Sequence, residues 1–144
     1  MEDGKKRVYL CQQLLIVPRY LLISRGAEVL RVPVDRLVYV SAERNYSHVH
    51  TRDGRSEMVS YQLGQVEDII GTQLGSDGRN FVRLGRGLIV NIDFVYHIDI
   101  TKQRLVLSDC DGCYYDIPAP RDVLIQLKAL IDDSFAQNNG TKKS

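Results

Sequence analysis

Two cysteines separated by two residues form the first motif in this sequence that suggests chemistry. Cys110 and Cys113 have the spacing of redox-active pairs and of one half of a zinc site. A redox pair is expected where a strand meets a helix, but this pair follows one β-like run and precedes another, and Asp109 and Asp111 beside it disfavour a thiolate. Structural zinc needs four ligands, and no second Cys or His pair has a suitable spacing. We therefore expect the pair in a hairpin turn without a chemical role.

Histidines and glycines offer two further possibilities for chemistry. His48 and His50 are two residues apart on an expected strand, so their side chains point from one face, as in some metal sites. The remaining histidine, His97, is distant in sequence. The segment Gly85–Gly87 lacks the third glycine and the lysine of a phosphate-binding loop, and no Ser or Cys stands in a recognisable nucleophile motif. We expect no enzyme activity, no cofactor and no metal site.

Arginines near expected turns are the strongest remaining candidates for a binding site. A planar guanidinium binds phosphate or guanine in a bidentate manner. Loops on a rigid sheet are able to enter a DNA groove, and neighbouring glycines let backbone N–H groups approach phosphates. The same arginines also fit an ordinary solvated surface, and residue types alone do not separate these interpretations. The arginines concerned are Arg44, Arg83, Arg86 and Arg121.

Length and composition restrict the class of protein. The chain has 144 residues, 44% hydrophobic and 26% charged, which is typical of one globular domain. With a net charge of +1, a site for a polyanion would be a local patch on a near-neutral body. The three cysteines fit a reducing cytoplasm better than a disulfide framework. No apolar stretch approaches the roughly 20 residues that span a bilayer, and Val8–Val17 lacks a signal-peptide cleavage pattern.

Hydrophobic periodicity predicts a mainly β domain with one or two short helices. Residues 1–24 are expected to form an N-terminal extension and first strand, residues 25–134 the domain, and residues 135–144 a disordered tail. The expected strands are Val8–Val17 (a strand or an apolar lead-in), Tyr20–Ser24, Glu28–Val34, Arg36–Ser41, Tyr46–Thr51, Arg55–Val59, Phe81–Leu84, Leu88–Val90, Phe94–Ile100, Arg104–Leu107 and Tyr114–Ile117.

Two segments have helical rather than strand periodicity. The first is expected to begin at an N-cap at Ser60 and to end at Gly75, with a loop over residues 76–80 after it. The second follows the prolines at 118 and 120. Its apolar face is expected to consist of Val123, Leu124, Leu127, Leu130 and Ile131.

From about Arg25 to Leu130 the chain resembles the LytTR family of DNA-binding domains. Three segments carry the resemblance, in the order and at the distances typical of the family. They are LVYVSAERNYSHVHTRDG at 37–54, FVRLGRGLIVN at 81–91 and IPAPRDV at 117–123. The resemblance implies an elongated β-sandwich of short strands. It also implies a bacterial transcription regulator of the kind that serves as the output domain of response regulators, with loops that enter successive major grooves of double-stranded DNA at promoters and bend it.

The resemblance also implies which loop residues face DNA. Arg44, Asn45 and Tyr46 would form the first DNA-facing loop, Arg86 would belong to the second, and Arg121 to the third. Arg86 or Arg121 would bind a guanine in a bidentate manner, Asn45 an adenine or phosphate, and Tyr46 a thymine methyl group or phosphate. Binding at paired sites implies a second copy of the chain as partner.

Other positions bear on these expectations. Arg83 and Asn91 would brace the domain or touch the DNA backbone. The family usually has histidine and serine where this chain has Gly85 and Gly87, so the second loop would bind through Arg86 and main-chain N–H groups. Too few residues precede the matching region for a receiver domain, so none is expected. How the chain is regulated is left open, with a separate signalling protein as one candidate partner. The alternative is a protein-interaction module that keeps the fold and has lost DNA reading, favoured by the two glycines and the near-neutral charge.

Overall fold

The structure, a computed structural model, describes residues 19–138, with side chains to Ser134. This part of the chain forms ten strands and two α-helices, α2 (Leu63–Leu74) and α3 (Arg121–Asn138), joined by three short 3-10 helices. The strands are β1 (Tyr20–Arg25), β2 (Glu28–Pro33), β3 (Leu37–Glu43), β4 (Tyr46–Thr51), β5 (Ser56–Val59), β6 (Phe81–Leu84), β7 (Leu88–Asn91), β8 (Val95–Asp99), β9 (Arg104–Ser108) and β10 (Tyr114–Pro118). The predicted mainly β class is confirmed.

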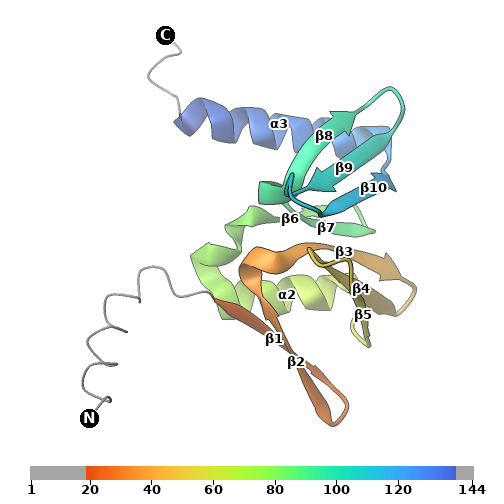
Figure 1. The fold of residues 1–144 in the computed structure, drawn as a ribbon, viewed down its shortest axis with the longest axis vertical. Helices are drawn as coiled ribbons and strands as arrows, with labels where there is room; N and C mark the ends of the chain where they lie inside the picture. The colour runs from red at the N-terminus through yellow and green to blue at the C-terminus, as the bar shows by residue number, and fades with distance from the viewer. Residues whose placement is uncertain (1–18, 139–144) are drawn as a thin grey trace, which may run out of the picture.

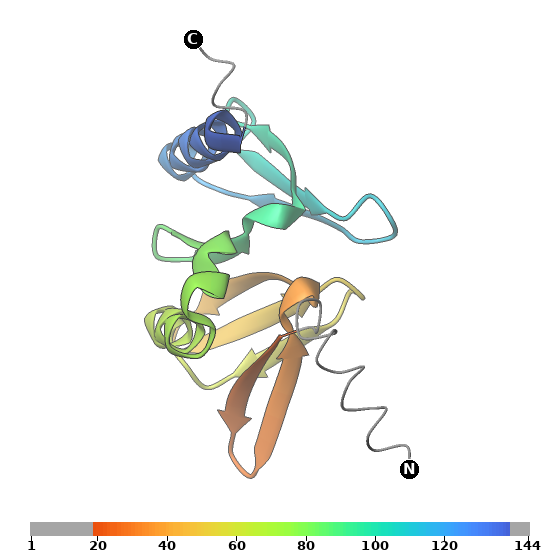
Figure 2. The same ribbon diagram turned by 90° about the vertical axis from the view of Figure 1, so that its left-hand side faces the viewer.

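The strands form three antiparallel sheets that follow one another along the long axis of the molecule (Figure 1). The hairpin of β1 and β2 lies at one end, a five-stranded sheet of order β5-β4-β3-β7-β6 in the middle, and a three-stranded sheet of order β10-β9-β8 at the other end. Figure 2 shows both α-helices on the same side of the sheets. Each sheet is built from sequence neighbours joined by short turns, except where β7 pairs with β3.

The five-stranded sheet is buried on both faces, and this gives the domain two cores. One face, with Val40 and Val49, packs with α2 and the β1–β2 hairpin. The other face, with Val90, packs with the three-stranded sheet and α3. In β3, a register shift between Leu37 and Tyr39 changes which residues belong to each core. Such a bulge interrupts the alternation of faces, so Val38 and Tyr39 both belong to the second core.

The helix α3 differs from its prediction in length and in one face residue. It runs to Asn138, so its backbone continues four residues into the segment 135–144 expected as a tail; residues 139–144 lie outside the described part of the chain. Leu124 and Leu127 are fully buried, as expected, whereas Leu130 is 37% exposed. Ile131, the next residue, packs against the core as expected, so Leu130 lies at the margin of the buried face.

The boundaries of α2 also correct the sequence predictions. The residue before the first turn is Gln62, not Ser60, and its backbone N–H donates to Gln65 Oε1 at 2.8 Å, as in a capping box. Residues after the helix continue as a 3-10 helix over Gly75–Asn80 instead of a loop. The possible strand at Val8–Val17 lies outside the described residues. Within residues 19–138, neither helix has the length and apolar character to span a membrane.

Candidate nucleic-acid interface

Three turns that are far apart in sequence lie at one edge of the molecule. They are the β3–β4 turn, the β6–β7 turn and the junction between β10 and α3. The Ala42 N–H donates to the Gly87 carbonyl at 2.9 Å, which places the end of β3 beside the start of β7. Gly85 faces α3, because a Cβ added to it would lie 3.2 Å from Val123 Cγ2. Figure 1 shows the three turns one above another on its right-hand side.

The β3–β4 turn presents the first group of expected DNA contacts. Arg44 has a φ of 58°, a left-handed conformation, and its side chain is exposed. Asn45 is exposed and its Oδ1 accepts a hydrogen bond from Gln62 Nε2 at 3.2 Å. Tyr46, the first residue of β4, is 44% exposed. A strained non-glycine residue in a turn is more common at functional sites than elsewhere.

The β6–β7 turn consists of Gly85, Arg86 and Gly87, and all three are exposed. Gly85 has a φ of 63° and touches Val123, so a side chain at this position would be strained and crowded. Gly87 has no positive φ, and a Cβ there would meet open space. The backbone conformation at position 85 therefore favours glycine over the histidine usual in the family. The backbone at position 87 places no such requirement on the residue.

Arg121 begins α3, immediately after Pro120, whose carbonyl accepts the Leu124 N–H at 3.1 Å. Its side chain is exposed. A cation in the first turn of a helix opposes the helix dipole, which favours anions at this end. Arg121 therefore gains no stabilisation from the dipole of the helix that it begins.

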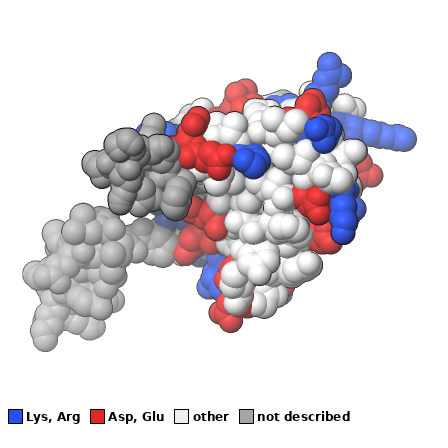
Figure 3. Space-filling model, turned by 90° about the horizontal axis from the view of Figure 1, so that it is seen from above, with Lys and Arg blue, Asp and Glu red and all other residues white. Residues whose placement is uncertain are grey.

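Arg44, Arg86 and Arg121 belong to the half of the described arginines that form no ion pair, together with Arg31, Arg36 and Arg79, which lie away from the three turns. Within residues 19–134, none of the three forms an ion pair. Six other arginines do, in the pairs Arg19–Asp77, Arg25–Glu28 and Arg25–Glu57, Arg52–Asp109, Arg55–Asp53, Arg83–Glu67 and Arg104–Asp116. Figure 3 shows Lys and Arg side chains projecting on the right, the side on which Figure 1 shows the three turns. The edge thus carries cations that are available to an external anion.

Arg83 and Asn91 brace this edge from inside. Arg83 donates to the Gly85 carbonyl and to Glu67 Oε1, both at 2.9 Å, and so connects the β6–β7 turn to α2. Asn91 is 3% exposed, and its Nδ2 donates to the Leu37 carbonyl at 2.9 Å. The burial of Asn91 leaves no access for DNA. The expectation that Asn91 contacts DNA is therefore corrected, and Asn91 braces the domain.

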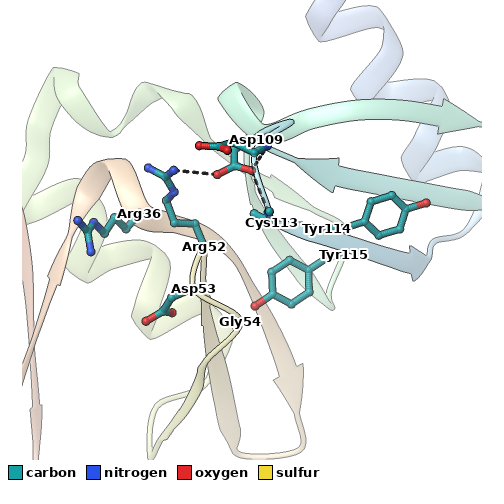
Figure 4. A pocket seen from close by; sticks show the side chains of 10 residues that line it. Arg36, Arg52, Asp53, Gly54, Asp109, Cys113, Tyr114 and Tyr115 are labelled. Carbon is teal, nitrogen blue, oxygen red and sulfur yellow. Dashed lines mark hydrogen bonds and ion pairs between the residues drawn. The ribbon is translucent and has the colours of Figure 1, made fainter.

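The cysteine pair lies in the β9–β10 turn, as expected. Cys113 lines a pocket of about 470 Å³ between that turn and the β4–β5 turn (Figure 4). Asp109 Oδ1 accepts the backbone N–H groups of Asp111 and Cys113 at 2.8 and 2.9 Å. Arg52 pairs with the other carboxylate oxygen at 3.0 Å. Burial, together with the charge of Asp109, raises the pKa of the Cys113 thiol. This environment disfavours a thiolate, and the pocket is at the opposite end of β4 from Arg44.

An aromatic cluster connects the middle sheet to the three-stranded sheet. The rings of Tyr39 and His50 stack with centroids 4.0 Å apart, and Tyr115 meets Tyr39 edge-on at 5.2 Å. The Tyr115 hydroxyl donates to the Thr51 carbonyl at 2.8 Å. Burial, with a smaller repulsion from His48, lowers the pKa of His50 to about 4. His50 and His48 do share one face, but the cluster uses the His50 ring for packing.

The lowered pKa of His50 predicts a loss of stability in mild acid. An unfolded histidine titrates near its ordinary pKa of 6.5, so between about pH 6.5 and 4 the unfolded state binds more protons and stability falls with falling pH. Allowing for solvent screening of a half-buried ring, we expect the free energy of unfolding to fall by about 1 kcal/mol from pH 7 to pH 5. Urea denaturation at both pH values measures this change.

His50→Gln should remove most of that pH dependence, whereas His97→Gln, at an exposed position, should leave it unchanged. Between pH 7 and pH 5 the carboxyl groups of Asp53 and Asp109 stay ionised and do not contribute to this pH dependence. Their pKa values are lowered, chiefly by the Thr51 hydroxyl and the Cys113 backbone N–H respectively, and they lose their stabilising effect only in stronger acid. An equal pH dependence in the wild type and His50→Gln would contradict the assignment.

Comparison with known proteins agrees with this geometry. The family of LytTr DNA-binding domains matches residues 27–132. The fold is similar to the LytTr DNA-binding domain of a protein described as a methyl-accepting/DNA response regulator from Bacillus cereus, with a TM-score of 0.55 and 20% identity, covering 78% of this chain and 95% of that chain. No curated protein matches the chain. Because the family match spans most of the sequence and the folds agree, this chain belongs to the LytTR family of DNA-binding domains.

Proposed function

We propose that this chain binds double-stranded DNA in a sequence-specific manner and acts, without enzyme activity, as a cytoplasmic transcriptional regulator. One observation carries the proposal. Arg44, Arg86 and Arg121 are exposed on three adjacent turns and have no ion-pair partner among the described residues. Loops that carry unpaired guanidinium groups on a rigid sheet suit both phosphate contacts and the edges of bases.

The order of the turns along the molecule supports a division of roles. The β3–β4 turn belongs to the middle sheet and the start of α3 to the end that carries the three-stranded sheet (Figure 1). A duplex that follows this edge would meet the turns at successive positions of its groove. Arg86 and Arg121 are assigned to guanines, Asn45 and Tyr46 to base edges or phosphates, and Arg44 to a phosphate.

The proposed partners also include a second copy of the chain on paired DNA sites and a separate signalling protein.

Salt dependence of binding tests the proposal. A site selected from a random DNA pool should bind the wild type with an affinity that falls steeply as salt rises, with a log–log slope of about −0.9 for each phosphate contacted. Arg44→Ala should make this slope shallower by about 0.9. Arg55→Ala removes the same charge from the β4–β5 turn, at the other end of β4, and should leave the slope unchanged.

Two outcomes would count against the proposal. If no fragment of a genomic library is retarded at moderate salt, the chain is a protein-interaction module that keeps this fold. If Arg44→Ala and Arg55→Ala change the slope equally, the edge defined by the three turns is not the DNA-binding surface.

A further inference from the structure

A fourth turn lies beside the three that are described above. Residues 100–103 connect β8 to β9, and the Ala119 N–H donates to the Gln103 carbonyl at 3.1 Å. Ala119 is two residues before Arg121, so this turn is attached to the segment that positions Arg121. Figure 1 shows the β8–β9 turn on the same side of the molecule as the start of α3.

The backbone of this turn is held by its own hydrogen bonds. The Lys102 N–H donates to Asp99 Oδ1 at 2.9 Å, and the Gln103 N–H donates to the Ile100 carbonyl at 3.3 Å. Gln103 has a φ of 57°, the conformation that reverses the chain direction. The Cα of Lys102 is therefore fixed in position, and its long side chain keeps its freedom.

Lys102 resembles the arginines of the three turns, Arg44, Arg86 and Arg121, in its exposure and its lack of an ion pair among the described residues. It is exposed, and it forms no ion pair within residues 19–134. The nearest acid in sequence, Asp99, is half-buried and accepts the turn's backbone N–H. The other acids that flank the turn are Asp116, which is paired with Arg104 at 2.9 Å, and Asp122, which is exposed in the first turn of α3.

The surface formed by the chain neighbours of Lys102 and Arg121 is shallow and uncharged. It is a depression of about 320 Å³ lined by Gln103, Pro118, Ala119 and Pro120. No carboxylate lines this depression, so nothing in it repels a sugar–phosphate strand. A lysine ammonium is a mobile point charge, which suits a phosphate oxygen better than the bidentate edge of a base.

We propose that Lys102 binds a DNA backbone phosphate next to the base contacted by Arg121, so that the β8–β9 turn is a fourth DNA-contacting element. The proposal rests on the function proposed above and adds an element outside the three family segments. Because a phosphate contact is independent of sequence, Lys102 contributes to affinity and not to discrimination.

Substitution of Lys102 tests this role on the full chain. Lys102→Ala and Lys102→Gln should each weaken binding to the selected site and to random DNA by the same factor, about fivefold at 0.1 M salt, and make the salt slope shallower by about 0.9. Lys102→Arg should restore both. Lys128→Ala is the matched control, because it removes the same charge from an exposed position on α3 where Lys128 pairs with Asp132 at 3.0 Å.

The outcomes separate this proposal from the function on which it rests. If the wild type binds DNA and Arg121→Ala weakens binding, but Lys102→Ala behaves like Lys128→Ala, the fourth contact is refuted and the proposed function stands. A loss confined to the selected site would also overturn the phosphate role. If the wild type binds no DNA, both proposals fail. Thermal unfolding of each variant confirms that the turn itself is intact.

Discussion

Replacing Arg121 with alanine is expected to lower the affinity for a selected DNA site by about 5- to 150-fold, while affinity for random DNA falls much less. The reason is the bidentate contact between a guanidinium and a guanine, which is worth about 1–3 kcal/mol of discrimination. Arg121 stands at the exposed start of α3 without an ion-pair partner among the described residues. Fluorescence anisotropy with both DNA ligands at a fixed salt concentration measures the two affinities.

A lysine at the same position distinguishes the effect of the positive charge on DNA binding from the effect of the planar guanidinium. Arg121→Lys keeps the positive charge but lacks the planar fork, so it should recover binding to random DNA and leave most of the specific loss. Because Arg121 opposes the helix dipole, neither substitution should destabilise α3. If Arg121→Ala weakens both DNA ligands equally, Arg121 binds a phosphate, and its assignment to a base is wrong.

Gly85→Ala is expected to reduce the free energy of unfolding by about 1–3 kcal/mol. A left-handed backbone costs a non-glycine residue about 1–2 kcal/mol, and at Gly85 the φ is 63°. The added methyl group would also lie 3.2 Å from Val123 Cγ2, in a core against which α3 packs. Urea denaturation gives the change in stability, and DNA affinity should fall as well because Arg86 would move with the turn.

Gly87→Ala provides the matched control within the same turn. Its backbone has no positive φ and a Cβ meets nothing within 4 Å, so the change in stability should stay within about 0.5 kcal/mol. Gly87→Ser would restore the residue usual in the family at an open position and should bind DNA at least as tightly as the wild type. Equal destabilisation by Gly85→Ala and Gly87→Ala would show that the turn does not adopt this conformation.

The hairpins were the most predictable part of the fold. The apolar runs in Tyr20–Arg25 and Glu28–Pro33, with the turn residues Arg25 and Gly26 between them, predict a hairpin from local information alone, and the two strands pair as predicted. Helix boundaries were less predictable. Ser60 has the chemistry of an N-cap, but Gln62 occupies that position because its backbone is the one that Gln65 reaches. Capping depends on geometry that residue preferences describe only on average.

The candidate site was predictable as a set of segments but not as a surface. The motif resemblance singled out Arg44, Arg86 and Arg121, and their roles toward DNA stay predictions. Asn91 belongs to one of the same segments, yet β7 lies in the middle of a sheet covered on both faces, and this buries its side chain. Lys102 lies outside the segments, and no local feature of its sequence shows that its turn is hydrogen-bonded to the segment before Arg121.

The sequence by itself determined the mainly β architecture, the LytTR family and the turns that carry arginines. These follow from composition, from periodicities of a few residues and from motifs that are continuous in the chain. Only the tertiary structure decided that the three arginine turns share one edge, that a side chain at position 85 would be strained and that the β8–β9 turn is hydrogen-bonded to the segment before Arg121. Each of these depends on a contact between residues far apart in sequence, such as Ala42 with Gly87 or Gln103 with Ala119, and such contacts leave no periodic signal in the chain.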